Sequence, residues 1–244
     1  MKIEISCTAN LGDFMNAMPV LSGISKSTNE KIELIIRPEM RKFNGLKQLL
    51  KKQEMFADVN FKDEVFVYGA VKNLSSWTRM DQNDPMRPVE TCRYENWFKD
   101  NYKIDFNVDD DFELKIEDVV MKASLRDKII IGDRWSSIQD PTIDNRRATN
   151  VIEQNVQLEG LNLNFLDYND DITYNCNLIK YSNHPFVTTF TGIGIVADLL
   201  NKETIVCWGD DMRVWDGHPV EYDFIRHYYG NRKSKLVYVK DVNL

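Results

Sequence analysis

The chain has 244 residues, of which 43% are hydrophobic and 28% charged, and its formal net charge is −7. This composition predicts a globular protein with room for one large domain or two small ones. The negative net charge argues against a protein that coats nucleic acid, because such binding depends on neutralising many phosphates. No apolar run is long enough to cross a bilayer, and residues 1–10 lack the apolar core of a signal peptide. We therefore expect a cytoplasmic protein, in the host cytoplasm if it is viral.

The first part of the chain predicts alternating strands and helices. We expect strands at residues 1–8, 31–37 and 64–68. Apolar side chains recur at helical spacing after the first strand, at Phe14, Met18, Leu21 and Ile24. Pro19 should kink or restart that helix. Residues 39–52 predict a second, amphipathic helix, and the whole progression is typical of a Rossmann-like half.

The pattern breaks at residues 70–108, which are rich in Trp, Arg, Asp and Pro. A long irregular insertion in a compact domain is often functional, so we expect Arg79, Asp81 and Arg87 to bind an acceptor. The alternative is a pair of short helices whose aromatic side chains complete the core. The acidic residues 108–120 predict a linker.

The second part repeats the alternation. We expect strands at residues 128–131, 161–166, 186–189, 204–208 and 235–239, and helices at residues 147–157, 176–181 and 195–201. The sequence therefore predicts an α/β fold of two Rossmann-like lobes with a cleft between them. The expected lobes are residues 1–122, on the acceptor side with the insertion at 70–108, and residues 123–244, which would bind a nucleotide sugar.

Asp13 is the candidate for acid–base chemistry. It follows the first strand, where α/β sheets bind ligands, and Gly12 before it leaves room for a substrate. A carboxylate there can act as a general base on a hydroxyl. It can equally be a carboxylate that only favours the dipole of the following helix.

Two stretches of the second part could hold a diphosphate. The loop GDRWSSIQDPTIDNRR offers Arg134, Ser136 and Arg146 for charge-assisted hydrogen bonds, although ordinary Asp–Arg pairs on a surface loop would give the same pattern. The Thr-Gly-Ile-Gly turn with Gly192 and Gly194 precedes a helix, whose N-terminus attracts anions. The third glycine of a dinucleotide fingerprint is absent, and a lone G-x-G is weak evidence for a cofactor.

Histidine and cysteine do not show metal-ligand spacing, so we expect no metal site. His218 follows the strand at 204–208 and is a candidate for acceptor binding, with a structural histidine as the alternative. Cys7 and Cys207 lie in apolar strand patterns and are expected to be buried core thiols.

Two motifs together resemble the GT-B heptosyltransferase family. LGDFMNAMPVLSGI is similar to its N-terminal signature, in which Gly-Asp is followed by a hydrophobic residue and Pro at Met18 and Pro19. TTFTGIGIVADLLNKETIVCWG is similar to its C-terminal signature. The resemblance implies that Asp13 is the general base and that Gly12 lines the acceptor approach. It also implies that the donor diphosphate is held by Thr191, Gly192 and Gly194. We add Gly209 to the donor side and Asn16 to the acceptor side.

The function expected from this resemblance is that of a metal-independent, inverting glycosyltransferase that uses a nucleoside-diphosphate sugar, with a UDP-sugar expected, and no cofactor. A composition rich in Asn, Lys, Asp and Ile is common in phages, so one predicted acceptor is a hydroxymethylated DNA base that receives glucose or arabinose. An alternative is a heptosyltransferase-like enzyme acting on a lipopolysaccharide or other glycan.

A non-catalytic nucleotide-sugar-binding module is a further alternative, favoured by Phe190 and Ile195, which depart from the family motif. A Rossmann-type oxidoreductase or methyltransferase is the last alternative, and the missing third glycine argues against a dinucleotide.

Overall fold

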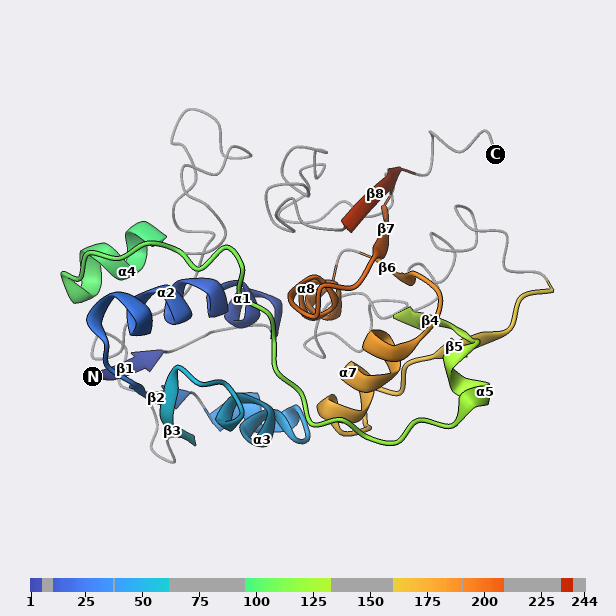
Figure 1. Cartoon of the computed structure of the whole chain (residues 1–244), viewed down its shortest axis with the longest axis horizontal. Helices are drawn as coiled ribbons and strands as arrows, with labels where there is room; N and C mark the ends of the chain where they lie inside the picture. Colours follow the sequence, from blue (N-terminus) through green and yellow to red (C-terminus); the bar gives the residue numbers. More distant parts are fainter. Residues whose placement is uncertain are drawn as a thin grey trace. The chain divides into compact units, whose positions relative to one another are not determined.

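The structure is a computed structural model of the chain (Figure 1). It describes residues 1–5, 11–36, 38–61, 95–132, 160–189, 191–208 and 234–238. The chain divides into two compact units. Unit 1 comprises Met1–Glu117 with Asn169–Thr173, and unit 2 comprises Asp118–Tyr168 with Tyr174–Leu244. Each unit carries a parallel sheet with connecting helices, so the α/β prediction is confirmed.

Unit 1 is built on a parallel sheet in the order β1-β2-β3. Its elements are β1 (Lys2–Ile5), α1 (Leu11–Asn16), α2 (Met18–Thr28), β2 (Ile32–Ile36), the 3-10 helix η1 (Pro38–Lys42), α3 (Leu46–Lys51), β3 (Phe56–Phe61) and α4 (Glu95–Tyr102). Ile3 pairs with Leu34, which pairs in turn with Val59. All three side chains are fully buried, so this row across the strands forms the centre of the sheet's core.

The first crossover is two helices, as Pro19 predicted. Ala17 is the N-cap of α2, and Pro19 occupies a position in its first turn. A proline there loses nothing, because its missing N–H would have no partner inside the helix. After Pro19, the hydrogen bonds of α2 include the one that Leu21 N donates to Ala17 O at 2.9 Å.

The predicted continuous helix at residues 39–52 is wrong. The chain forms η1 and then α3, and Gly45 between them has a φ of +78°. The carboxylate of Asp171 packs so closely that a Cβ on Gly45 would lie 2.1 Å from its Oδ2. A glycine at this φ ends one helix and starts the next, which sequence periodicity alone does not reveal.

β3 is a strand that the sequence did not predict. The predicted strand at residues 64–68 lies outside the described residues, whereas β3 is Phe56–Phe61. Asp58 and Asn60 conceal this strand, because both residue types are poor strand formers. In β3 their side chains interact with each other and with α3: Asp58 accepts a hydrogen bond from Asn60 Nδ2 at 2.7 Å and pairs with Lys51 Nζ at 3.0 Å.

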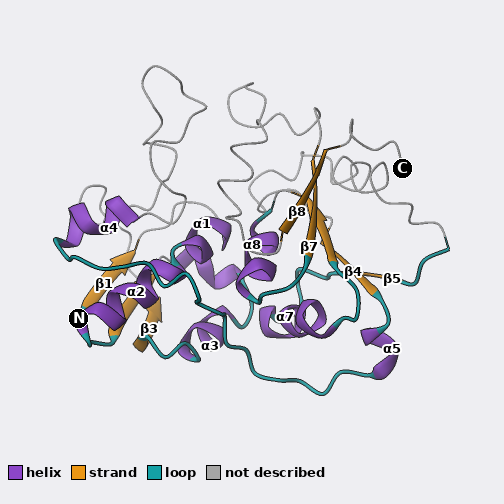
Figure 2. Cartoon of the chain, turned by 45° about the horizontal axis from the view of Figure 1, so that its top comes forward, coloured by secondary structure: helices purple, strands orange, loops and turns teal. Residues whose placement is uncertain are grey.

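The predicted acidic linker is packed on unit 1 for much of its length. After α4 the chain runs extended beside α2, as Figures 1 and 2 both show. Asp109 N donates to Pro19 O at 3.1 Å, and its carboxylate accepts from Ser22 Oγ at 2.5 Å and pairs with Lys26 Nζ at 2.7 Å. The acidic character of this segment therefore serves attachment to α2 rather than solvation of a linker.

Gln53 fastens the next part of the same segment. Its Nε2 donates to Lys115 O at 2.8 Å, and Lys115 N donates to its Oε1 at 3.0 Å. Phe112 and Leu114 are buried between these two attachments, and Phe106 is buried before the first of them. The division between the units falls after Glu117, beyond the packed segment.

Unit 2 is built on a parallel sheet in the order β5-β4-β6-β7-β8. Its elements are α5 (Ala123–Arg126), β4 (Ile129–Gly132), β5 (Leu163–Phe165), α7 (Ile172–Tyr181), β6 (Phe186–Thr189), α8 (Gly192–Leu199), β7 (Thr204–Trp208) and β8 (Ser234–Tyr238). Figures 1 and 2 show α7 and α8 on the same face of this sheet. Two successive right-handed crossovers in one direction produce that arrangement.

Several bounds in unit 2 differ from the prediction. β6 and β7 have the predicted ends, but α7 begins at Ile172 and α8 at Gly192, earlier than expected. The predicted helix at residues 147–157 lies outside the described part of the chain. None of the helices described is long and apolar enough to cross a membrane.

Gly23 gives a test of the contact between α2 and the extended segment. A Cβ on Gly23 would lie 2.0 Å from the backbone oxygen of Asn107, so Gly23→Ala must displace the segment. We expect the free energy of unfolding in urea to fall by about 1–3 kcal/mol. Glycine to alanine in an unobstructed helix would instead raise it by roughly 0.5–1 kcal/mol.

Ser27→Ala is the matched control, because Ser27 is exposed on the same helix and receives the same side chain. We expect a change within about 0.5 kcal/mol for this control. A stabilised Gly23→Ala protein would show that the extended segment does not lie against α2.

Candidate functional site

The strand order of unit 2 has a switch point between β4 and β6. The chain places β5 on one side of β4 and then crosses to β6 on the other side. In open α/β sheets, ligands bind outside the carboxyl ends of the strands at such a point. β4 ends at Gly132 and β6 ends at Thr189, and Gly132 pairs with Thr188. The carboxyl ends of these two strands therefore define the candidate site.

Thr188 joins the two strand ends. Its side chain is fully buried, and its Oγ1 donates to Gly132 O at 2.9 Å. The same oxygen lies 3.2 Å from Thr189 O and 3.3 Å from Thr191 Oγ1. One hydroxyl thus links the end of β4 to the residue that begins α8.

Gly132 fits between β6 and α8 because it has no side chain. A Cβ there would lie 2.8 Å from Phe186 Cζ and 3.1 Å from both Thr188 Oγ1 and Ile193 Cγ2. Phe186 belongs to β6 and Ile193 to α8, so the end of β4 touches both elements. Any larger residue would push the N-terminus of α8 away from the sheet.

The N-terminus of α8 is suited to an anion. Thr191 is its N-cap in an extended conformation, and the Thr191 side chain makes no capping hydrogen bond to the helix. The first turn carries no acidic residue, and Gly192 within it is half-buried. The positive end of the helix dipole is therefore not offset by a carboxylate of its own first turn. Gly192 and Gly194, predicted in a turn, lie in the first turn of the helix instead.

The second group of predicted residues lies on α1 in unit 1. Gly12 is buried, and Asp13 follows it in the helix, although its side chain is outside the described atoms. Asn16 ends α1 with 7% of its surface exposed. Its Nδ2 is buried and has no hydrogen-bond partner among the residues that the structure describes. α1 follows β1, so these residues lie toward the carboxyl end of that strand.

The remaining predicted residues cannot be placed. They lie outside the described part of the chain: Arg79, Asp81, Arg87, Arg134, Ser136, Arg146, Gly209 and His218. The structure brings Thr191, Gly192 and Gly194 together on α8. It adds Gly132 and Thr188, which sequence reasoning missed and which only the strand order could have indicated. Within the described ranges, no three His, Cys, Asp or Glu side chains form a group that could hold a metal ion.

The fold of the chain is similar to that of glycosyltransferases in solved structures. The glycosyl transferase family 9 protein from Veillonella parvula DSM 2008 matches with a TM-score of 0.57 and 11% identity, over 98% of this chain and 86% of that protein. The E. coli heptosyltransferase WaaC with ADP matches with a TM-score of 0.53 and 11% identity, over 98% of this chain and 93% of WaaC. No protein-family model and no curated protein matches the sequence.

These similarities show the fold alone. The chain has the GT-B fold of two Rossmann-like α/β units, which confirms the predicted fold class and the predicted likeness to heptosyltransferases.

Cys207 allows a chemical test of the packing beside this site. It pairs with Thr189 across β6 and β7 and is fully buried, and burial raises the pKa of its thiol to about 12. Only the thiolate reacts, so iodoacetamide near pH 9.0, the ordinary pKa of a thiol, should label Cys207 in unfolded but not in native protein. Peptide mass spectrometry measures the labelled fraction.

The raised pKa of Cys207 makes the free energy of unfolding depend on pH. The neutral buried thiol stabilises the fold below pH 9.0, and that contribution is lost as the pH rises toward about 12. Rapid labelling of Cys207 in the native protein would contradict its placement in the core of β7. The prediction that Cys207 is a core thiol is confirmed, whereas Cys7 lies outside the described residues.

Proposed function

We propose that the protein is a glycosyltransferase that moves a sugar from a nucleoside-diphosphate sugar to an acceptor hydroxyl. The observation that carries the proposal is the switch point of unit 2, where the N-terminus of α8 meets the ends of β4 and β6. This is where an α/β sheet binds a phosphorylated ligand. The GT-B fold of the whole chain supports the same choice among phosphate-binding functions.

The donor diphosphate would lie at the start of α8, against Thr191, Gly192 and Gly194. Backbone N–H groups and the positive end of the helix dipole attract its oxygens. The sequence adds Arg134, Ser136, Arg146 and Gly209 as further donor contacts. A bound ADP in the structurally similar WaaC supports a nucleoside diphosphate as the ligand class, and the UDP-sugar expected from the sequence stays a prediction.

The acceptor would bind at α1, with Asp13 as the general base. Its carboxylate takes the proton of the acceptor hydroxyl while that oxygen forms a bond to the anomeric carbon. The bond from the anomeric carbon to the diphosphate breaks, and the departing diphosphate keeps the electron pair. Attack from the side opposite the leaving group inverts the anomeric centre. No metal ion takes part in this scheme. Arg134, Arg146 and the N-terminus of α8 would stabilise the negative charge of the departing diphosphate instead.

The acceptor class has two candidates. The similarity to WaaC favours a heptosyltransferase-like enzyme with a glycan acceptor. A hydroxymethylated DNA base rests on the composition of the sequence and stays a prediction. For either acceptor, Arg79, Asp81, Arg87 and His218 are predicted from the sequence to lie on the acceptor side.

Asp13→Asn tests the catalytic assignment. Transfer from a panel of nucleotide sugars is measured by product mass on a core oligosaccharide and on hydroxymethylated DNA, in the presence of EDTA. We expect the variant to lose about 10²–10⁴-fold in rate, because general-base catalysis supplies that much. Binding of the nucleoside diphosphate should not change.

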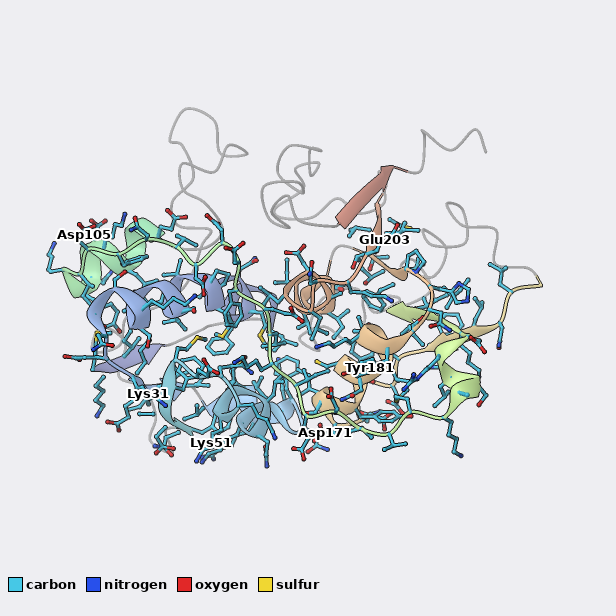
Figure 3. The ribbon with its side chains drawn as sticks, in the orientation of Figure 1. Lys31, Lys51, Asp105, Asp171, Tyr181 and Glu203 are labelled. Carbon is cyan, nitrogen blue, oxygen red and sulfur yellow. The ribbon has the colours of Figure 1, made fainter. Side chains whose placement is uncertain are left out.

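Asp105→Asn is the control, since it removes the same charge from an exposed position in unit 1 (Figure 3). It should transfer sugar at the wild-type rate. Near wild-type transfer by Asp13→Asn would rule out the base. Binding without any transfer by the wild-type protein would favour the non-catalytic binding module.

Gly192→Asp tests the donor site. A carboxylate at the start of α8 would occupy the anion position and repel a diphosphate, so UDP and ADP should bind at least about tenfold more weakly, or about 1.4 kcal/mol. The same charge favours the helix dipole by about 0.3–1 kcal/mol, so stability should not fall for electrostatic reasons. Isothermal titration calorimetry measures the affinity.

Ala123→Asp is the matched control, because it adds the same charge to the exposed start of α5 in the same unit. Its affinity for nucleotides should equal that of the wild type. Unchanged binding by Gly192→Asp would place the diphosphate elsewhere.

A further inference from the structure

Asn16 is a buried polar residue that nothing described in the fold explains. It is 7% exposed, and its Nδ2 finds no hydrogen-bond partner in the described part of the chain. The residues before and after it in the chain, Met15 and Ala17, are fully buried as well. A buried polar amide costs free energy unless it is hydrogen-bonded. A leucine of similar size would suit the position better if packing alone decided it.

Other buried amides hold the fold together. Gln53 bonds the backbone of Lys115 at both ends of its side chain, and Asn177 Oδ1 accepts from Val119 N at 2.9 Å. Each of these fastens an extended segment to a helix. The Nδ2 of Asn16 makes no hydrogen bond to a residue that the structure describes, so this donor has no role in the described fold.

The position of Asn16 connects it to the proposed base. It follows Asp13 by three residues and Gly12 by four on α1. Residues at these spacings are neighbours on a helix, with about 5–6 Å between their Cβ atoms. A ligand that reaches Asp13 at the carboxyl end of β1 is therefore within reach of Asn16 as well.

We propose that the amide of Asn16 binds a second hydroxyl of the acceptor. This second hydroxyl is on the carbon next to the one that bears the hydroxyl deprotonated by Asp13. The inference rests on the proposed function. An amide offers two donors and an acceptor, and a hydroxyl both donates and accepts, so the two groups match. Rotation about χ2 is soft for asparagine, which lets either end of the amide meet the hydroxyl. The acceptor is accordingly a sugar with neighbouring hydroxyls rather than an isolated hydroxymethyl group on a base.

The first experiment compares Asn16→Leu with Asn177→Leu in urea unfolding. Both replace a buried helical asparagine by leucine, but only Asn177 has a described hydrogen bond to lose. We expect the midpoint of Asn177→Leu to fall and that of Asn16→Leu to stay or rise. A loss for Asn16→Leu as large as that for Asn177→Leu would overturn the inference, because the amide would then serve the free protein.

The second experiment measures kcat/KM on a core oligosaccharide and on the same acceptor deoxygenated next to the reacting hydroxyl. Asn16→Leu should lose about tenfold or more on the full acceptor, since one hydrogen bond is removed. It should lose little on the deoxy acceptor, which cannot make that bond. Affinity for UDP and ADP should stay at the wild-type value. Equal losses on both acceptors, or no loss, would overturn the proposal.

The two experiments separate this inference from the proposed function. Wild-type protein that transfers sugar to hydroxymethylated DNA alone would keep the glycosyltransferase and overturn the neighbouring-hydroxyl role. Wild-type protein that transfers sugar to no acceptor would overturn the proposed function. The unfolding comparison would still decide whether the amide of Asn16 stabilises the free protein.

Discussion

Close approach between β4, β6 and α8 is the constraint on which unit 2 depends. Gly132 ends β4 without a side chain, and this lets Ile193 of α8 come within van der Waals distance. Thr188 Oγ1 then ties the Gly132 carbonyl to the start of the helix. The N-terminus of α8 is fixed at the switch point by these contacts, before any ligand arrives. A preorganised set of N–H groups needs no rearrangement to meet a charged ligand.

Unit 1 achieves a similar rigidity by another route. Its extended segment is held by the carboxylate of Asp109 on α2 and by the amide of Gln53 at the end of α3. Gly23 allows the backbone of this segment to lie directly on the helix. The segment in turn covers α2, which continues from α1 and its candidate residues. The acidic composition that resembles a linker thus supports the element next to Asp13.

Strands and motifs could be predicted from the sequence where the information is local. β6 and β7 are short apolar runs between turn residues, and their ends were predicted correctly. β3 was missed because Asp58 and Asn60 break its pattern. The start of α8 was misplaced because glycine is a poor helix former, although its low propensity matters less in the first turn, where backbone N–H groups have no partner inside the helix. The long helix at 39–52 was wrong because Gly45 has a positive φ and packs against Asp171, which is far away in the chain.

The residues of the candidate site also fall into two groups: those that a local motif indicates and those that only the strand order indicates. Gly12, Asp13, Thr191 and Gly192 belong to local motifs and could be found by reading along the chain. Gly132 and Thr188 acquire their meaning only once β4 and β6 are neighbours, and strand order is a long-range property that no local pattern carries.

The buried polar groups of this fold have different roles, and their hydrogen-bond partners distinguish these roles. Thr188 and Gln53 are buried with their bonds made inside their own unit, so their removal should cost stability first. Asn16 is buried and its Nδ2 has no hydrogen-bond partner in the described structure, so this donor makes no bond that stabilises the described fold. An unpartnered buried donor one helical turn from Asp13 fits the ligand-binding role that we propose for it. Stability and activity should then respond in opposite directions when Asn16 is replaced, which is the behaviour that distinguishes a binding residue from a packing residue.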